Sequence, residues 1–186
     1  MLYGGNLMKN KAVIILCVVL FFTSCSVKSN TKDFIEQSES INSQISEISN
    51  KVVEYISKGE QQKLYDMFSE TNREQIDIMA QINDVFEEIN VQELNFDNLK
   101  EHESGGGEDY QEGKIIRYSY GSVIEGITDK SENKYVISYG CTIIDDEHPE
   151  YIGLCQLSIY KVNYIDEYSY EIEVDNSIGD LTLHRR

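Results

Sequence analysis

Cys141 and Cys155 are the two residues whose spacing best suits a covalent link. They lie in two runs of alternating apolar and polar residues, 134–145 and 152–162, on either side of a turn. This alternation predicts an antiparallel hairpin with one apolar face. With the turn centred on His148, the two cysteines face each other at a Cβ separation of roughly 4.5–5.5 Å, which can narrow to disulfide distance. We predict a disulfide, with two reduced thiols as the alternative in an anoxic habitat.

The other residues with catalytic or ligand chemistry form no recognisable site. A catalytic thiol is not expected, because no histidine is placed to activate either cysteine. The histidines stand alone, without partners at metal-ligand spacing, and we expect them in solvent: His102, His148 and His184. Four acids on one helical segment lack a converging histidine and predict a solvated face: Asp77, Asp84, Glu87 and Glu88. We therefore predict no catalytic, cofactor-binding or metal-binding residues.

The run Ser104-Gly105-Gly106-Gly107 is the only glycine-rich stretch that could suggest a phosphate cradle. No lysine follows at the spacing of a phosphate-binding loop, and Glu108 and Asp109 would repel a phosphate. The run predicts a flexible connection.

Tyrosines are concentrated in the second half of the chain, where they alternate with polar residues. Four of them fall on the predicted inward faces of strands: Tyr118, Tyr120, Tyr139 and Tyr170. A buried tyrosine needs a partner for its hydroxyl, so these residues indicate internal hydrogen bonds or a wet pocket. The alternative is that tyrosine is abundant here because it favours strands.

The first 24 residues have the pattern of a bacterial lipoprotein signal peptide. Lys9 and Lys11 precede an apolar run, 12–22, that is too short to span a bilayer. Phe22-Thr23-Ser24-Cys25 resembles a lipobox, although leucine is usual at the position of Phe22. The resemblance implies that Cys25 is lipidated and becomes the mature N-terminus. Residues 25–32 then form a short tether to the membrane.

The true start of the chain is predicted at Met8, because Gly4-Gly5 can be encoded by a ribosome-binding sequence. About 160 residues remain after the signal, which suits one domain, 33–180. The formal charge of the whole chain is −17. Nucleic acid is excluded as a partner, since its binding requires clustered basic residues. Solubility at a cell surface explains this acidity more simply than a specific cation site does.

Three helices are predicted before the strands. Apolar residues at seven-residue spacing, from Phe34 to Tyr55, predict a long amphipathic helix over 33–57, which we expect to dock on a sheet rather than form a coiled coil. A short helix follows over 60–68. Thr71-Asn72-Arg73-Glu74 has the pattern of a capping box and predicts the start of a third helix, which runs to about residue 89.

Four to five antiparallel strands follow the helices. The predicted strands are 91–103, 116–124, the two arms of the hairpin, and 168–174. Helices followed by strands indicate an α+β domain in which about three N-terminal helices pack on a curved antiparallel sheet.

The order of these parts resembles a family of uncharacterised lipoproteins of low-GC Gram-positive bacteria with the NTF2-like, cystatin-like roll. The segments that carry the resemblance are Leu64-Tyr65-Asp66-Met67-Phe68-Ser69, Tyr135-Val136-Ile137-Ser138-Tyr139 and Gly153-Leu154. The resemblance covers about residues 40–165 and implies an NTF2-like roll in which helices and sheet enclose a cone-shaped cavity. It implies no established activity.

The sequence favours a membrane-anchored binding module on the extracytoplasmic face of the cell membrane, which holds a small apolar or aromatic ligand in the cone. The alternative is a protein-interaction or structural lipoprotein that uses the polar outer face of the sheet, and a homodimer through that face is compatible with its composition. An enzyme is disfavoured, because the inward positions are aliphatic or tyrosine without an acid or base beside them.

Overall fold

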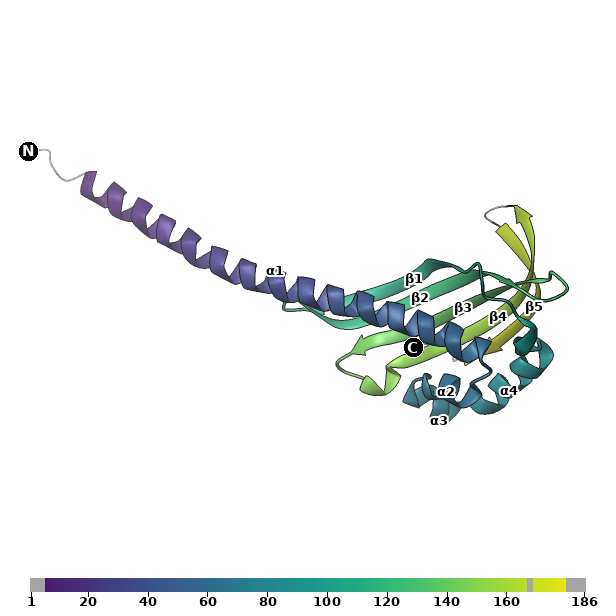
Figure 1. Ribbon diagram of the computed structural model, residues 1–186. Coiled ribbons are helices and arrows are strands. Elements are labelled where there is room, and N and C mark those ends of the chain that lie inside the picture. The colour runs from purple at the N-terminus through teal and green to yellow at the C-terminus, as the bar shows by residue number, and fades with distance from the viewer. Residues whose placement is uncertain (1–5, 167–168, 180–186) are drawn as a thin grey trace, which may run out of the picture.

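The computed structural model describes residues 6–166 and 169–179, with side chains from residue 32 onward except for 166 and 174–176. The described chain is an α+β domain in which helices pack on one face of an antiparallel sheet (Figure 1). The predicted α+β class is confirmed. The helices are α1 (Asn6–Ser57), α2 (Gln61–Asp66), α3 (Glu70–Gln75) and α4 (Ile78–Glu88), with a 3₁₀ turn at Val91–Glu93.

Five strands of the described chain form the sheet, and each strand pairs with the next in sequence. They are β1 (Lys100–Gln111), β2 (Lys114–Thr128), β3 (Lys134–Asp145), β4 (Gly153–Asp166) and β5 (Ser169–Ile178). Such a meander needs only short turns between strands, which the charged segments between the predicted strands supply.

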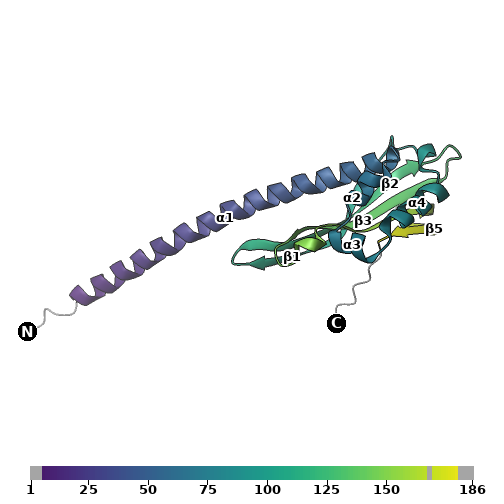
Figure 2. The ribbon, with the colours of Figure 1, turned by 90° about the horizontal axis from the view of Figure 1, so that it is seen from below.

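α1 crosses the sheet and extends well beyond it (Figures 1 and 2). Of the residues at seven-residue spacing, Ile41 is 3% exposed, whereas Phe34 is 37% exposed. Val52 and Ile56, at adjoining positions of the same helix face, are fully buried. The helix ends at Ser57, one residue before Lys58-Gly59. Residues 25–32, predicted as a tether, have helical backbone as part of α1.

The predicted third helix is wrong, because two helices with separate caps occupy its place. The Ser69 hydroxyl accepts a hydrogen bond from the Asn72 amide and begins α3, while the Asp77 carboxylate accepts one from the Ala80 amide and begins α4. Thr71, the expected cap, instead donates its hydroxyl hydrogen to the carbonyl of Glu150 at 3.2 Å. Local caps upstream and downstream of the expected box therefore set the helix boundaries.

The prediction that the glycine run is a flexible connection is wrong. Gly105, Gly106 and Gly107 are strand residues of β1 and pair with β2. The ladder uses only backbone groups, so a run without side chains can pair once a neighbouring strand provides partners. Conversely, the predicted strand 91–103 begins only at Lys100.

The hairpin of β3 and β4 has the predicted register only in the part far from the turn, from Lys134 to Gly140. Tyr139 pairs with Leu157, as expected, but the register shifts after Gly140, so that Cys141 pairs with Leu154. Cys155 is therefore the extra residue of a bulge. Cys141 is buried, Cys155 is exposed, and both thiols are free, so the predicted opposed pair and its disulfide are not formed.

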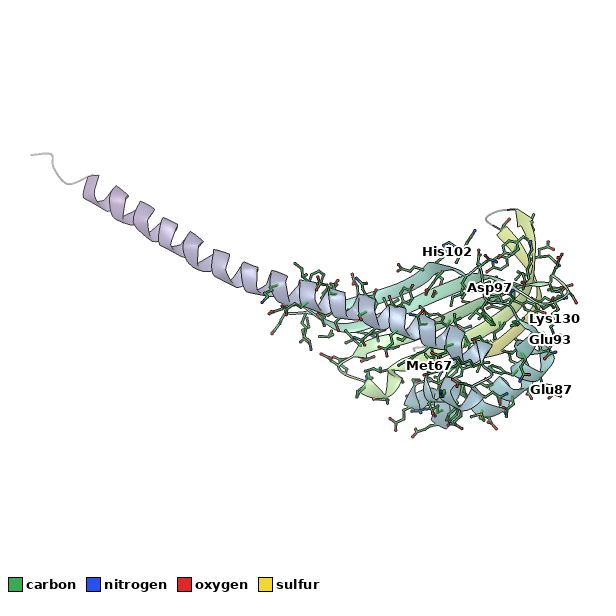
Figure 3. All side chains as sticks on the ribbon, viewed as in Figure 1. Met67, Glu87, Glu93, Asp97, His102 and Lys130 are labelled. Carbon is green, nitrogen blue, oxygen red and sulfur yellow. The ribbon has the colours of Figure 1, made fainter. Side chains whose placement is uncertain are left out.

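The bulge results from contact with the helical layer. The connector between α2 and α3 lies beside β4, where the Leu154 amide donates to the Met67 carbonyl at 2.8 Å and the Ser69 amide donates to the Leu154 carbonyl at 3.0 Å. Gly153 has φ +125°, and a Cβ there would lie 2.8 Å from the Met67 oxygen. Two of the segments that carry the family resemblance thus meet in space, and Figure 3 places Met67 beneath α1.

Candidate functional site

A polar cluster of three buried hydroxyls and one exposed glutamate joins α1 to the sheet. Its centre is one carboxylate oxygen of Glu101, which accepts hydrogen bonds from the hydroxyls of Ser49 at 2.5 Å and Ser122 at 2.6 Å. The Tyr139 hydroxyl lies 2.5 Å from the Ser49 hydroxyl and 3.3 Å from the same Glu101 oxygen. We call Ser49, Glu101, Ser122 and Tyr139 the hydroxyl cluster.

The hydroxyl cluster holds elements together and leaves little room for a ligand. Ser122 is fully buried, Tyr139 is 2% exposed and Ser49 is 5% exposed. Burial raises the pKa of the Tyr139 hydroxyl well above its ordinary value. The phenol is therefore neutral at physiological pH and can donate a hydrogen bond, but it is a poor base.

Three of the four tyrosines predicted to line a pocket lie on the inner face, and the fourth does not. Tyr118 and Tyr120 pack against the apolar core, and the Tyr120 and Tyr139 rings are 6.5 Å apart. Burial also raises the pKa of both Tyr118 and Tyr120. Tyr170 instead packs edge-on against Tyr164 at 5.7 Å, at the far end of β4 and β5. The four residues do not surround one cavity.

An open cleft lies at this far end of the sheet, where β1 and β3 begin and where β2 and the long arm of β4 end. It has a volume of about 360 Å³, and we call it the Tyr164 cleft. Its lining residues come from four strands: Lys100, Glu125, Gly126, Ile127, Thr128, Lys134 and Tyr164. Lys130, in the turn between β2 and β3, and Glu93 mark the same end of the molecule in Figure 3 and form an ion pair of 3.3 Å.

A bulge in β2 shapes the Tyr164 cleft. The pairing of β2 with β3 shifts register between Ile124 and Ile127, and Gly126 within this bulge has φ +87°. A Cβ on Gly126 would lie 2.0 Å from the Asn98 carbonyl oxygen, so only glycine allows this approach. Bulges bend strands and commonly occur beside binding sites.

The walls of the cleft combine apolar and charged groups. Ile127 is buried in its floor, and the Tyr164 ring forms one side. The Lys134 ammonium lies over this ring, 5.0 Å from its centre. Glu125 lies 4.0 Å from the exposed His102 imidazole. Burial and the nearby Glu125 raise the pKa of both Tyr164 and Tyr170.

Sequence reasoning missed every residue that lines this cleft. One available signal was Gly126, because extending the predicted strand 116–124 to Ile127 makes it an isolated glycine inside a strand, which indicates a bulge or a close backbone approach. The lysines carried no signal of their own, because their neighbours depend on strand register.

The remaining predicted sites have simple surroundings. His102 and His148 are exposed, as expected, although each lies beside a glutamate, and His184 is outside the described residues. Cys25 belongs to the part of α1 whose side chains are not described. In the described part of the chain, no cluster of three metal-ligating side chains occurs.

The described residues form an α+β domain with an open cleft at one end of its antiparallel sheet. Residues 51–173 match the family described as a domain of unknown function, DUF5104, and the chain belongs to this family. The match extends from the end of α1 into β5 and so includes all the strands that form the cleft. Curated proteins provide no match. Within the described residues, no helix has the length and apolarity needed to cross a membrane.

Proposed function

We propose that this protein is a binding module of the cell envelope that holds a small ligand in the Tyr164 cleft. The observation that carries the proposal is the cleft itself, a concavity of about 360 Å³ with an aromatic wall and a few charged groups. Small-molecule sites typically have this combination and volumes of about 300–1,000 Å³. The inner face supports a ligand less well, because its central tyrosine is buried and hydrogen-bonded.

A thermal-shift screen of the full chain in a neutral detergent tests this proposal. A ligand present at a hundred times its dissociation constant stabilises a protein by about 2.7 kcal/mol, which raises the melting temperature by roughly 5–10 °C in a chain of this size. We expect ligand-dependent shifts that Tyr164→Ala abolishes. Tyr110→Ala is the matched control, because Tyr110 is a half-exposed tyrosine at the other end of the sheet. Shifts that survive Tyr164→Ala, or a screen without any shift, would contradict the proposal.

The N-terminal sequence supports a proposal about the location of the protein. We propose a lipoprotein that is anchored through Cys25 to the extracytoplasmic face of the membrane and whose domain is an NTF2-like roll. The lipobox-like residues before Cys25 support the anchor, and the curled antiparallel sheet beneath helices is compatible with the roll. Metabolic labelling with radioactive palmitate tests the anchor: the wild-type chain should be labelled, and Cys25→Ala should not. Labelling of Cys25→Ala would refute it.

A further inference from the structure

We propose that the Tyr164 cleft is selective for small organic anions, in which a phosphate or carboxylate is held between Lys100 and Lys134. The inference rests on the proposed binding function and specifies the chemical class of the ligand.

The lysines of the cleft are exceptional in their lack of acidic partners. Seven of the nine lysines with described side chains form an ion pair with a carboxylate. The two that do not are Lys100 and Lys134, and both line the Tyr164 cleft. The chain has 33 acidic residues against 16 basic ones, so acidic partners are plentiful.

The one acid among the lining residues, Glu125, lies beside a histidine outside the lining. Glu125 pairs with Lys100 across β1 and β2, a position from which a carboxylate can reach an ammonium. Its carboxylate instead lies 4.0 Å from His102. Lys134 has its ammonium over the Tyr164 ring. Both cations therefore keep their hydrogen-bond donors available to an incoming anion.

The other lining residues determine which chemical group of the ligand can bind beside its phosphate or carboxylate. The Tyr164 ring provides apolar surface, and Thr128, which is also in the lining, carries a hydroxyl. A bare inorganic ion would leave the apolar surface uncovered. An anion with a small apolar or aromatic part would cover it and gain hydrophobic stabilisation in addition to the charge contacts.

The negative charge of the whole chain does not prevent an anion from binding in the cleft, because only nearby charges act on it strongly. Charges farther apart than about 8 Å are largely screened at physiological ionic strength. The two lysines line the same small cleft, so an anion within it is close to both of them, and Glu125 is the one acid among the lining residues. The same chemistry could belong to a soluble compound or to the headgroup of an anionic lipid.

Isothermal titration calorimetry of the full chain in a neutral detergent tests the inference with three probes: phenyl phosphate, inorganic phosphate and uncharged benzyl alcohol. Phenyl phosphate should bind more tightly than the other two. Lys100→Gln and Lys134→Gln should each weaken it about tenfold, as expected for loss of one charge-assisted contact. Lys114→Gln is the matched control, because Lys114 is paired with Asp146 away from the cleft, and it should change the affinity less than twofold.

The outcomes separate this inference from the proposed function. Anion selectivity is refuted if benzyl alcohol binds with the same affinity as phenyl phosphate and the lysine variants do not weaken its binding. If Tyr164→Ala does weaken it, the cleft is still a binding site. If no probe binds, both are refuted. Co-sedimentation with phosphatidylglycerol and phosphatidylcholine vesicles distinguishes the two sources of the anion. Lysine-dependent binding to phosphatidylglycerol vesicles alone indicates a lipid headgroup. If phenyl phosphate binds but the phosphatidylglycerol vesicles do not, the ligand is a soluble anion.

Discussion

Replacing Glu101 by alanine should destabilise the domain by removing the acceptor at the centre of the hydroxyl cluster. The lost oxygen accepts hydrogen bonds from two buried serines at 2.5 and 2.6 Å and lies 3.3 Å from the Tyr139 hydroxyl. Ser49 and Tyr139 can still bond to each other, but the fully buried Ser122 loses its 2.6 Å bond and keeps a 3.4 Å contact with the His102 carbonyl beside the neighbouring tyrosine hydroxyls. A buried donor left without a good partner costs about 1–3 kcal/mol.

We therefore expect Glu101→Ala to lower the free energy of unfolding by about 2 kcal/mol, which corresponds to a decrease in melting temperature of roughly 4–8 °C. Urea unfolding followed by circular dichroism measures it. Glu103→Ala is the matched control, because Glu103 is, like Glu101, an exposed acid of the same strand but does not belong to the hydroxyl cluster, and a change within about 0.5 kcal/mol is expected there. Glu101→Gln should fall between the two. Equal effects of Glu101→Ala and Glu103→Ala would refute the structural role of the cluster.

Three further predictions concern the bulge and the thiols. Gly153→Ala should cost about 1–3 kcal/mol, measured by urea unfolding, because its φ of +125° and the nearby Met67 oxygen oppose a side chain, whereas Gly107→Ala, with only the Ser119 hydroxyl at 3.6 Å, should be nearly neutral. Differential alkylation, read by peptide mass, should modify Cys155 before Cys141 in the native protein. Both thiols should react after unfolding without reductant. If neither reacts, the two cysteines form a disulfide after all. Burial raises the pKa of the Cys141 thiol from 9.0 to about 12, so the unfolded chain loses this proton at a lower pH than the folded chain does. The free energy of unfolding should therefore fall by about 1.4 kcal/mol per pH unit as the pH rises between these two values. Cys141→Ala should reduce this slope.

The hairpin shows how far periodicity determines a sheet. A turn centred on His148 places Tyr139 opposite Leu157 and Ile137 opposite Ile159, and both pairs form. Periodicity could not predict the bulge at Cys155, because that bulge depends on a distant residue. The Asn72 side chain donates to the Cys155 carbonyl at 2.6 Å, a contact across 83 positions of the chain.

The same limit explains why the cleft was missed while the tyrosines were noticed. Aromatic residues on alternating positions are visible in a sequence, so Tyr139 was correctly placed inside. The partner of each hydroxyl, and the lack of an acidic partner for Lys100 and Lys134 among the described residues, depend on which strands lie side by side. These relations are properties of the assembled sheet.

The most direct test of the binding function is a titration of the isotopically labelled full chain with phenyl phosphate, followed by amide chemical shifts in NMR spectra. A ligand in the Tyr164 cleft should shift the amides of Gly126, Ile127 and Thr128 in a saturable manner, and Tyr164→Ala should abolish these changes. Saturable shifts confined to the surroundings of Tyr118 and Tyr139 would place the ligand on the inner face and contradict our proposal.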